Sequence, residues 1–159
     1  MEITYKKILV PIDFSDFSKN AFKYSLSFAK QHNATITLVY VMEPVFYPPD
    51  LSLGQITLPA VDLDMEGKAR EELEKVADLA RNEGVAAATI IKMGKPFVEI
   101  IDTAREEDSD LIIISTHGHS GMEQILFGST ADKVVRKAPC PVLVIRDPIK
   151  GFNYKEAKG

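Results

Sequence analysis

The chain has 159 residues, of which 45% are hydrophobic and 26% are charged, with a formal net charge of -4. This length and composition are typical of one ordinary globular domain. The net negative charge excludes the global basic field that draws a protein to nucleic acid or to an anionic membrane. No apolar run approaches the roughly 18 residues of a membrane span, so we expect neither nucleic acid nor membrane as a partner.

Two features predict the compartment. Residues 1–7 lack the basic-then-apolar order of a secretory signal peptide. Cys140 is the one cysteine of the chain, so no internal disulfide can form, which suits a reducing environment. We therefore expect a cytoplasmic protein.

Strand-like and helix-like patterns alternate through the first half of the chain. Short apolar runs predict strands, and apolar side chains at helical spacing, such as Phe17, Ala21 and Tyr24, predict helices. Prolines and a glycine in residues 43–60 predict a long loop. The elements expected in this half are a strand at 8–12, a helix at 16–32, a strand at 34–41 and a helix at 62–83.

The same alternation continues in the second half. Gly94 and Pro96 separate a strand from the helix that follows it. The expected elements are a strand at 86–93, a helix at 96–107, a strand at 111–114, a helix at 131–137 and a strand at 141–146. We assign residues 1–146 to one domain and residues 147–159 to a C-terminal tail.

Strands separated by helices predict parallel pairing through right-handed crossovers, with helices on both faces of the sheet. The expected fold class is therefore α/β, a single doubly wound domain. In such sheets ligands bind at the carboxyl ends of the strands, where the winding direction reverses. Asp13-Phe14-Ser15 follows the first strand, and a loop at 115–130 follows the fourth. Both segments line one crevice if these two strands are neighbours, which the sequence pattern alone leaves open.

The loop at 115–130 carries the clearest functional signal. It follows the buried strand at 111–114 and ends at Gly128-Ser129-Thr130. Ser129 with Asp132 three residues later predicts a helix start close to a capping box. A strand, a bare loop and a helix N-terminus form a phosphate site, because unpaired N–H groups and the helix dipole favour an anion. The sequence therefore predicts a site for the phosphates of a nucleotide.

These segments resemble the universal stress protein family over nearly the whole chain, from residues 7–15 to residues 138–146. The nucleotide-binding members carry a glycine, two residues, a second glycine, nine residues, and then a glycine followed by Ser or Thr. Ser115, Gly118 and Gly128-Ser129 stand at that spacing, with serine in place of the first glycine. The resemblance implies a five-stranded parallel sheet of order 3-2-1-4-5, a homodimer, and binding of ATP or another adenine nucleotide.

The resemblance also implies roles for individual residues. Asp13 is expected to contact the ribose, and the backbone of Val41 to meet the adenine, with Pro11 close by. The phosphates are expected at the two glycines of the loop and at the start of the following helix. The complete set of expected nucleotide-binding residues is Pro11, Asp13, Val41, Ser115, Gly118, His119, Gly128, Ser129 and Thr130. The implied strand order makes the first and fourth strands neighbours.

Serine at position 115 leaves two outcomes open. If the backbone there requires a positive φ, serine costs roughly 1–2 kcal/mol or reshapes the loop. If the backbone is extended, a small serine fits, and its hydroxyl is able to donate a hydrogen bond to a phosphate. We expect the second outcome.

Asp13 and the two histidines of the loop each have a plainer interpretation. Asp13 is also a candidate N-cap of the helix at 16–32, but Ser15 competes for that role, so we expect Asp13 at the ligand. His117 and His119, without a nearby cysteine or an HExxH pattern, are a weak indication of a metal site. We therefore expect no intrinsic metal, and Mg²⁺ or Mn²⁺ only together with nucleotide phosphates.

The expected function is that of a dimeric ATP-binding sensor or regulatory module of the stress response, not an enzyme. Cys140 lies between two prolines, an unfavourable place for a lowered thiol pKa, and the chain has no GxxxxGK[ST] motif. One alternative is an interaction protein that no longer binds nucleotide, as Ser115 suggests. Another is an enzyme that hydrolyses ATP slowly. The apolar loop at 43–60 fits a lid, a partner-binding surface or a passive connection equally.

The last strand predicts the dimer interface. In the implied order Val142–Ile145 is an apolar edge strand, which favours unwanted pairing unless it is covered. Pairing with a second copy covers that edge. We therefore expect a homodimer that forms through Val142–Ile145.

Overall fold

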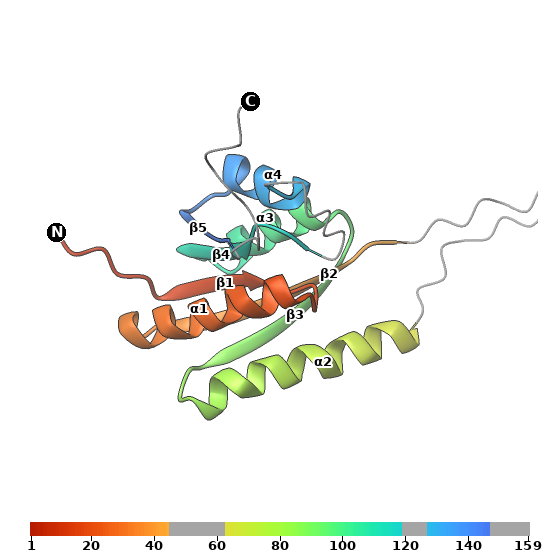
Figure 1. The fold of residues 1–159 in the computed structure, drawn as a ribbon, viewed down its shortest axis with the longest axis horizontal. Coiled ribbons are helices and arrows are strands. Elements are labelled where there is room, and N and C mark those ends of the chain that lie inside the picture. Colours follow the sequence, from red (N-terminus) through yellow and green to blue (C-terminus); the bar gives the residue numbers. More distant parts are fainter. Residues whose placement is uncertain (45–62, 119–126, 147–159) are drawn as a thin grey trace, which may run out of the picture.

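Five parallel strands form one sheet at the centre of the molecule (Figure 1). The computed structural model describes residues 1–44, 63–118 and 127–146. Within these ranges the strands are β1 (Lys7–Pro11), β2 (Thr35–Met42), β3 (Ala87–Met93), β4 (Leu111–Ser115) and β5 (Val142–Ile145). The helices are α1 (Asp16–His32), α2 (Leu63–Asn82), α3 (Pro96–Glu106) and α4 (Ser129–Lys137).

The strand order is β3-β2-β1-β4-β5, which confirms the predicted doubly wound α/β fold. β1 occupies the centre of the sheet, because Ile8 pairs with Ile36 of β2 on one side and with Leu111 of β4 on the other. The chain winds from β1 out to β3 and then returns to the opposite side of β1 at β4. The winding direction therefore reverses between β1 and β4, which is where such sheets bind their ligands.

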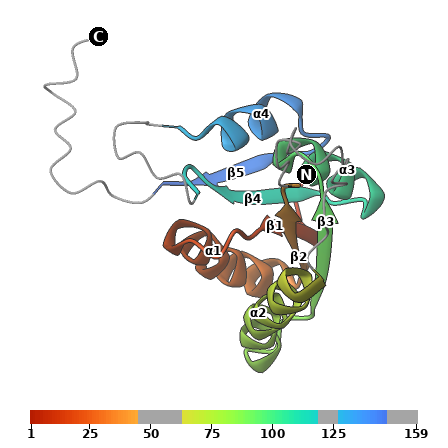
Figure 2. The same cartoon turned by 90° about the vertical axis from the view of Figure 1, so that its right-hand side faces the viewer.

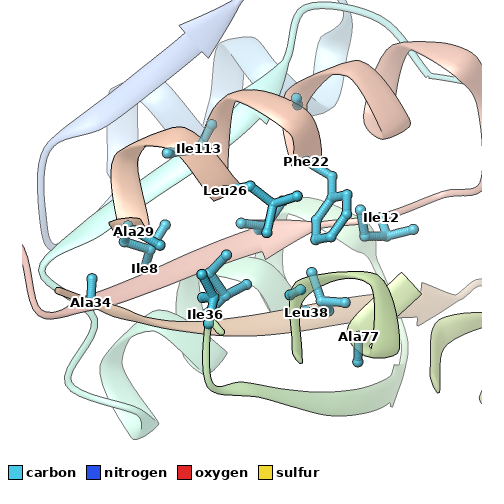
Figure 3. Packing of buried hydrophobic residues seen from close by; sticks show 14 of the residues in the cluster. Ile8, Ile12, Phe22, Leu26, Ala29, Ala34, Ile36, Leu38, Ala77 and Ile113 are labelled. Carbon is cyan, nitrogen blue, oxygen red and sulfur yellow. The ribbon is translucent and has the colours of Figure 1, made fainter. Parts of the chain in front are cut away.

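Two pairs of helices cover the two faces of the sheet (Figure 2). α1 and α2 pack on one face, and α3 and α4 pack on the other. Successive residues of a strand point to opposite faces, so Ile8 contacts the first pair of helices and Leu9 the second. Figure 3 shows Leu26 of α1 over Ile36 of β2 and Phe22 over Leu38. The middle residues of β1 and every residue of β4 are buried, so the two strands that end at the switch point are covered on both faces.

The element boundaries agree with the sequence predictions to within about two residues. The predicted loop at 43–60 lies outside the described residues from position 45 onward, and the predicted tail at 147–159 lies wholly outside them. The assignment of residues 1–146 to one domain stays a prediction. Among the described helices, none combines the length and the apolar character needed to cross a membrane.

α1 and α4 begin in different ways. The Ser15 side chain caps α1 by accepting a hydrogen bond from the backbone N–H of Ser18 at 3.2 Å. The N-cap of α4 is Gly128, and no side chain among the described residues caps this helix. The predicted capping pair of Ser129 and Asp132 is therefore wrong: Ser129 is already helical, which moves the cap one residue earlier. Glycine is tolerated as an N-cap, and it leaves the first amides of α4 without a side-chain acceptor.

Candidate functional site

A pocket of about 470 Å³ lies at the carboxyl ends of β1, β2 and β4, beside the first turns of α3 and α4. Its volume is in the range of small-molecule sites, and its position is the switch point of the sheet. Every described residue of the predicted site lines it: Pro11, Asp13, Val41, Ser115, Gly118, Gly128, Ser129 and Thr130. His119 was also predicted, but it lies outside the described residues.

The pocket has further lining residues that sequence reasoning did not assign to a nucleotide. Most of them are sequence neighbours of predicted site residues at the strand ends, so the predicted strand boundaries could have identified them. Pro96 and Ile100 belong to α3, which carries no motif. Their position follows only from the crossover that starts α3 at the same edge of the sheet. The additional lining residues are Ile12, Ser18, Val39, Tyr40, Glu43, Pro96, Ile100, Ile114, Thr116, His117 and Ala131.

Asp13 faces the pocket and does not cap α1. Its Oδ1 accepts a hydrogen bond from the N–H of Ser15 at 3.0 Å and a short one from the Ser15 hydroxyl. Its Oδ2 points toward Gly118, so a Cβ atom at position 118 would overlap this oxygen. The prediction that Ser15 caps the helix and leaves Asp13 directed at the crevice is confirmed.

The turn that carries Asp13 contains a strained residue. Phe14 has a φ of 64°, in the left-handed region that side chains other than glycine rarely adopt. This conformation costs roughly 1–2 kcal/mol, so packing has to hold it in place. The Phe14 ring packs against Tyr40, with the ring centroids 4.9 Å apart. The contact fixes the turn and with it the direction of Asp13.

Ser115 is compatible with the loop. It is the last residue of β4, it pairs with Ile145 of β5, and it is not among the described residues with positive φ. The expectation of an extended backbone at this position is therefore confirmed. The Ser115 hydroxyl donates a hydrogen bond to the backbone carbonyl of His117 at 2.8 Å. This hydrogen bond holds the start of the loop, and a contact between the Ser115 hydroxyl and a phosphate stays a prediction.

Gly128 closes the loop by direct contact of backbone with backbone. Its N–H donates a hydrogen bond to the Thr116 carbonyl at 2.7 Å. A Cβ atom at position 128 would lie 2.7 Å from that same carbonyl oxygen, closer than real side chains come. Glycine is therefore required at this position for space, because its φ of -65° suits any residue.

The start of α4 supplies hydrogen-bond donors to the pocket. The first-turn amides of an α-helix have no acceptor within the helix, and here Ser129, Thr130 and Ala131 line the pocket. The partial positive charge of the helix N-terminus adds to them. Together with the Gly118 backbone across the pocket, this turn is able to hold an anionic group.

The side chains of the pocket carry little positive charge of their own. Asp13 and Glu43 contribute carboxylates, and none of the described lining residues is Lys or Arg. Burial, together with these two carboxylates, raises the pKa of the Tyr40 phenol above its ordinary value. The phenol is therefore protonated at neutral pH and adds no further negative charge. An anion in this pocket depends on backbone amides and on charges outside it.

His117 and Cys140 show no reactive arrangement. The Nδ1 atom of His117 lies 2.8 Å from the Thr116 hydroxyl, and its ring packs on Phe17. No cluster of three metal-ligating side chains occurs within residues 1–44, 63–118 and 127–146. Burial and the nearby Asp110 raise the pKa of the Cys140 thiol, which confirms that this cysteine has no lowered thiol pKa.

Comparison with known proteins identifies similar chains. The model of the universal stress protein family matches residues 4–146. A universal stress protein of Methanocaldococcus jannaschii is 38% identical over 94% of this chain and 86% of its own. The solved universal stress protein of Lactobacillus plantarum has a TM-score of 0.79 and 30% identity, over 91% of this chain and 100% of that one. A universal stress protein from Archaeoglobus fulgidus, solved in complex with dAMP, has a TM-score of 0.66 and 25% identity, over 90% of this chain and 99% of that one.

Proposed function

Because the chain belongs to the universal stress protein family, we propose that it binds an adenine nucleotide in the pocket at the β1–β4 switch point. The observation that carries the proposal is that Asp13 and the uncapped start of α4, residues Gly128–Thr130, line one pocket although they are far apart in the sequence. A carboxylate accepts hydrogen bonds from hydroxyl groups, and the amides of a helix start donate to phosphate. A related structure that contains dAMP supports the same ligand class.

In the proposed arrangement the nucleoside lies toward β1 and β2, and the phosphates lie toward α4. Asp13 accepts a hydrogen bond from the ribose, while the Val41 backbone and Pro11 lie at the adenine. Gly118 and the turn Gly128–Thr130 hold the phosphates, with Ser115 keeping the loop in place. His119 is proposed as a further phosphate contact on the family resemblance alone. ATP is the proposed physiological ligand, and Mg²⁺ or Mn²⁺ would arrive with its phosphates.

Calorimetric titration tests the proposed function. We expect AMP, dAMP and ATP each to bind with one site per chain, and pyrimidine nucleotides to bind at least about tenfold more weakly, since the adenine contacts are lost. Thermal denaturation in the presence of nucleotide is the second measurement, because a ligand that binds only the folded state raises the unfolding temperature. No heat and no thermal shift with millimolar nucleotide would contradict the proposal and favour an interaction protein.

We propose that the nucleotide is sensed or stored in the stress response and not turned over. The Oδ1 atom of Asp13 already accepts two hydrogen bonds from Ser15, and the proposal assigns the other carboxylate oxygen to the ribose and not to a proton transfer. The chain also lacks the lysine of a GxxxxGK[ST] loop. A regulatory role in the cytoplasm is part of the same proposal, supported by the single cysteine.

We further propose that the protein is a homodimer through β5. In the sheet order β5 is a terminal strand, and Val142, Leu143 and Val144 are only half-buried in the chain described. A second copy would cover this edge and satisfy its backbone groups. Size-exclusion chromatography with light scattering is expected to give twice the mass of the chain. A single mass of one chain at micromolar protein would reject the dimer.

A further inference from the structure

Three lysine side chains surround the ring of Phe97 next to the pocket. The ammonium nitrogens of Lys133, Lys137 and Lys95 lie 4.9, 5.5 and 5.6 Å from the ring centroid. Phe97 itself is partly buried against the core cluster that the sheet forms with α3 and α4. We call Lys95, Lys133 and Lys137 the lysine cluster. Each cation is attracted by the ring, but the three also repel one another.

The carboxylates of the described residues form no ion pair that would offset this repulsion. None of the lysine cluster takes part in an ion pair within the residues that the structure describes, whereas Lys30 pairs with Glu83 and Lys75 with Glu72. Like charges one helical turn apart, as at positions 133 and 137, destabilise a helix slightly. In a chain with a net charge of -4, this cluster is a local positive surface without a described partner.

The lysine cluster continues the phosphate end of the pocket. Lys95 directly precedes Pro96, which lines the pocket at the start of α3. Ser129, Lys133 and Lys137 are spaced four residues apart, so they lie along one face of α4. α3 and α4 contact each other, and both begin at the pocket. The lysine cluster therefore adjoins the pocket lining at Pro96 on α3 and at Ser129 on α4.

We propose that the lysine cluster binds the far end of a phosphate chain whose near end lies on the Gly128–Thr130 turn. The site then favours adenine nucleotides with longer phosphate chains over AMP. The argument is one of charge: the described lining of the pocket offers two carboxylates and no Lys or Arg, so additional phosphates meet no cation until they reach the lysine cluster. The proposal rests on the proposed function, because it assumes that the nucleotide occupies the pocket.

The test compares the triple variant K95Q/K133Q/K137Q with the wild type. Affinities are measured by calorimetry for AMP, ATP, adenosine 5′-tetraphosphate and inorganic tripolyphosphate, without divalent cations. We expect wild-type affinity to rise with phosphate number and the variant to lose roughly tenfold for the tetraphosphate, the sum of three exposed ion pairs, with little change for AMP. The variant removes both the mutual repulsion of the lysines and their attraction to the Phe97 ring, so thermal denaturation without ligand is measured alongside to check that the fold is retained.

A control variant with the same loss of charge is K23Q/K68Q/K75Q, on α1 and α2 across the sheet. It should leave the preference for long phosphate chains intact, and an equal loss in this control would overturn the proposal. The proposal would also be overturned if the triple variant lost as much affinity for AMP as for the tetraphosphate, or if it lost affinity for neither ligand. In both cases the proposed function would stand. If neither AMP nor ATP binds the wild type, the proposed function fails, and lysine-dependent binding of tripolyphosphate then tests the lysine cluster alone. Lysine-dependent binding of a poly-glutamate peptide without any chain-length effect would assign the surface to an acidic protein instead.

Discussion

Replacement of Gly128 by alanine is expected to lower the affinity for AMP and ATP by at least about tenfold, or roughly 1.4 kcal/mol. The new Cβ would lie 2.7 Å from the Thr116 carbonyl oxygen, which also accepts the hydrogen bond from the Gly128 N–H. The Cβ position is fixed by the backbone of residue 128 and the oxygen belongs to the backbone of Thr116, so neither atom is able to rotate away. The start of α4 has to move relative to β4, and its amides then leave the positions at which they hold phosphate. Calorimetry measures the loss, and circular dichroism checks that the fold is retained.

Gly67 offers a matched control for this substitution. It lies within α2, and a Cβ atom there meets nothing within 4 Å. Gly67→Ala should leave nucleotide affinity unchanged and raise the free energy of unfolding by about 1 kcal/mol, because alanine is the better helix former. Unchanged nucleotide affinity in folded Gly128→Ala would show that the turn does not hold the phosphates.

Local sequence patterns are sufficient to predict the helices and strands, but they do not predict the order of the strands in the sheet. Apolar periodicity predicts each strand and helix, because burial on one or two faces is a property of the segment itself. The order of parallel strands is set by crossovers between distant segments, so it came from the family resemblance and not from periodicity. The same limit explains why Pro96 and Ile100 were missed at the pocket, and why the approach of Lys95 to α4 was not predicted.

Single positions show where sequence reasoning is ambiguous. Ser129 has the residue type and spacing of a helix cap, but the contact between the backbones of Gly128 and Thr116 places the cap one residue earlier. Ser115 occupies a position where related motifs carry glycine, and only the pairing of β4 with β5 shows that an extended serine fits there. In both cases a tertiary contact decides between two local conformations that the residue type permits.

The two carboxylate oxygens of Asp13 have different surroundings, and this leads to the second large effect. Oδ1 accepts hydrogen bonds from Ser15, while Oδ2 is directed at Gly118 and the pocket. Asp13→Asn keeps the size of the side chain, and its amide oxygen is still able to accept from Ser15. The group toward the pocket becomes an NH₂ donor. We expect adenosine and ATP to lose affinity equally, by roughly ten- to a hundredfold, since a hydrogen bond to a charged acceptor contributes about 1.5–3 kcal/mol.

Comparison of two ligands separates the role of Asp13 from that of the Gly128 turn. Gly128→Ala should weaken ATP more than adenosine, because it displaces phosphate donors, whereas Asp13→Asn should weaken both to the same extent, because the ribose is common to both. Asp16→Asn is the control, since it removes an exposed carboxylate from the first turn of α1, outside the pocket lining. If the Asp13 carboxylate merely repelled phosphates, Asp13→Asn would instead strengthen ATP binding and leave adenosine unchanged. A gain in ATP affinity would therefore remove Asp13 from the ribose contact and reverse the proposed orientation of the nucleotide.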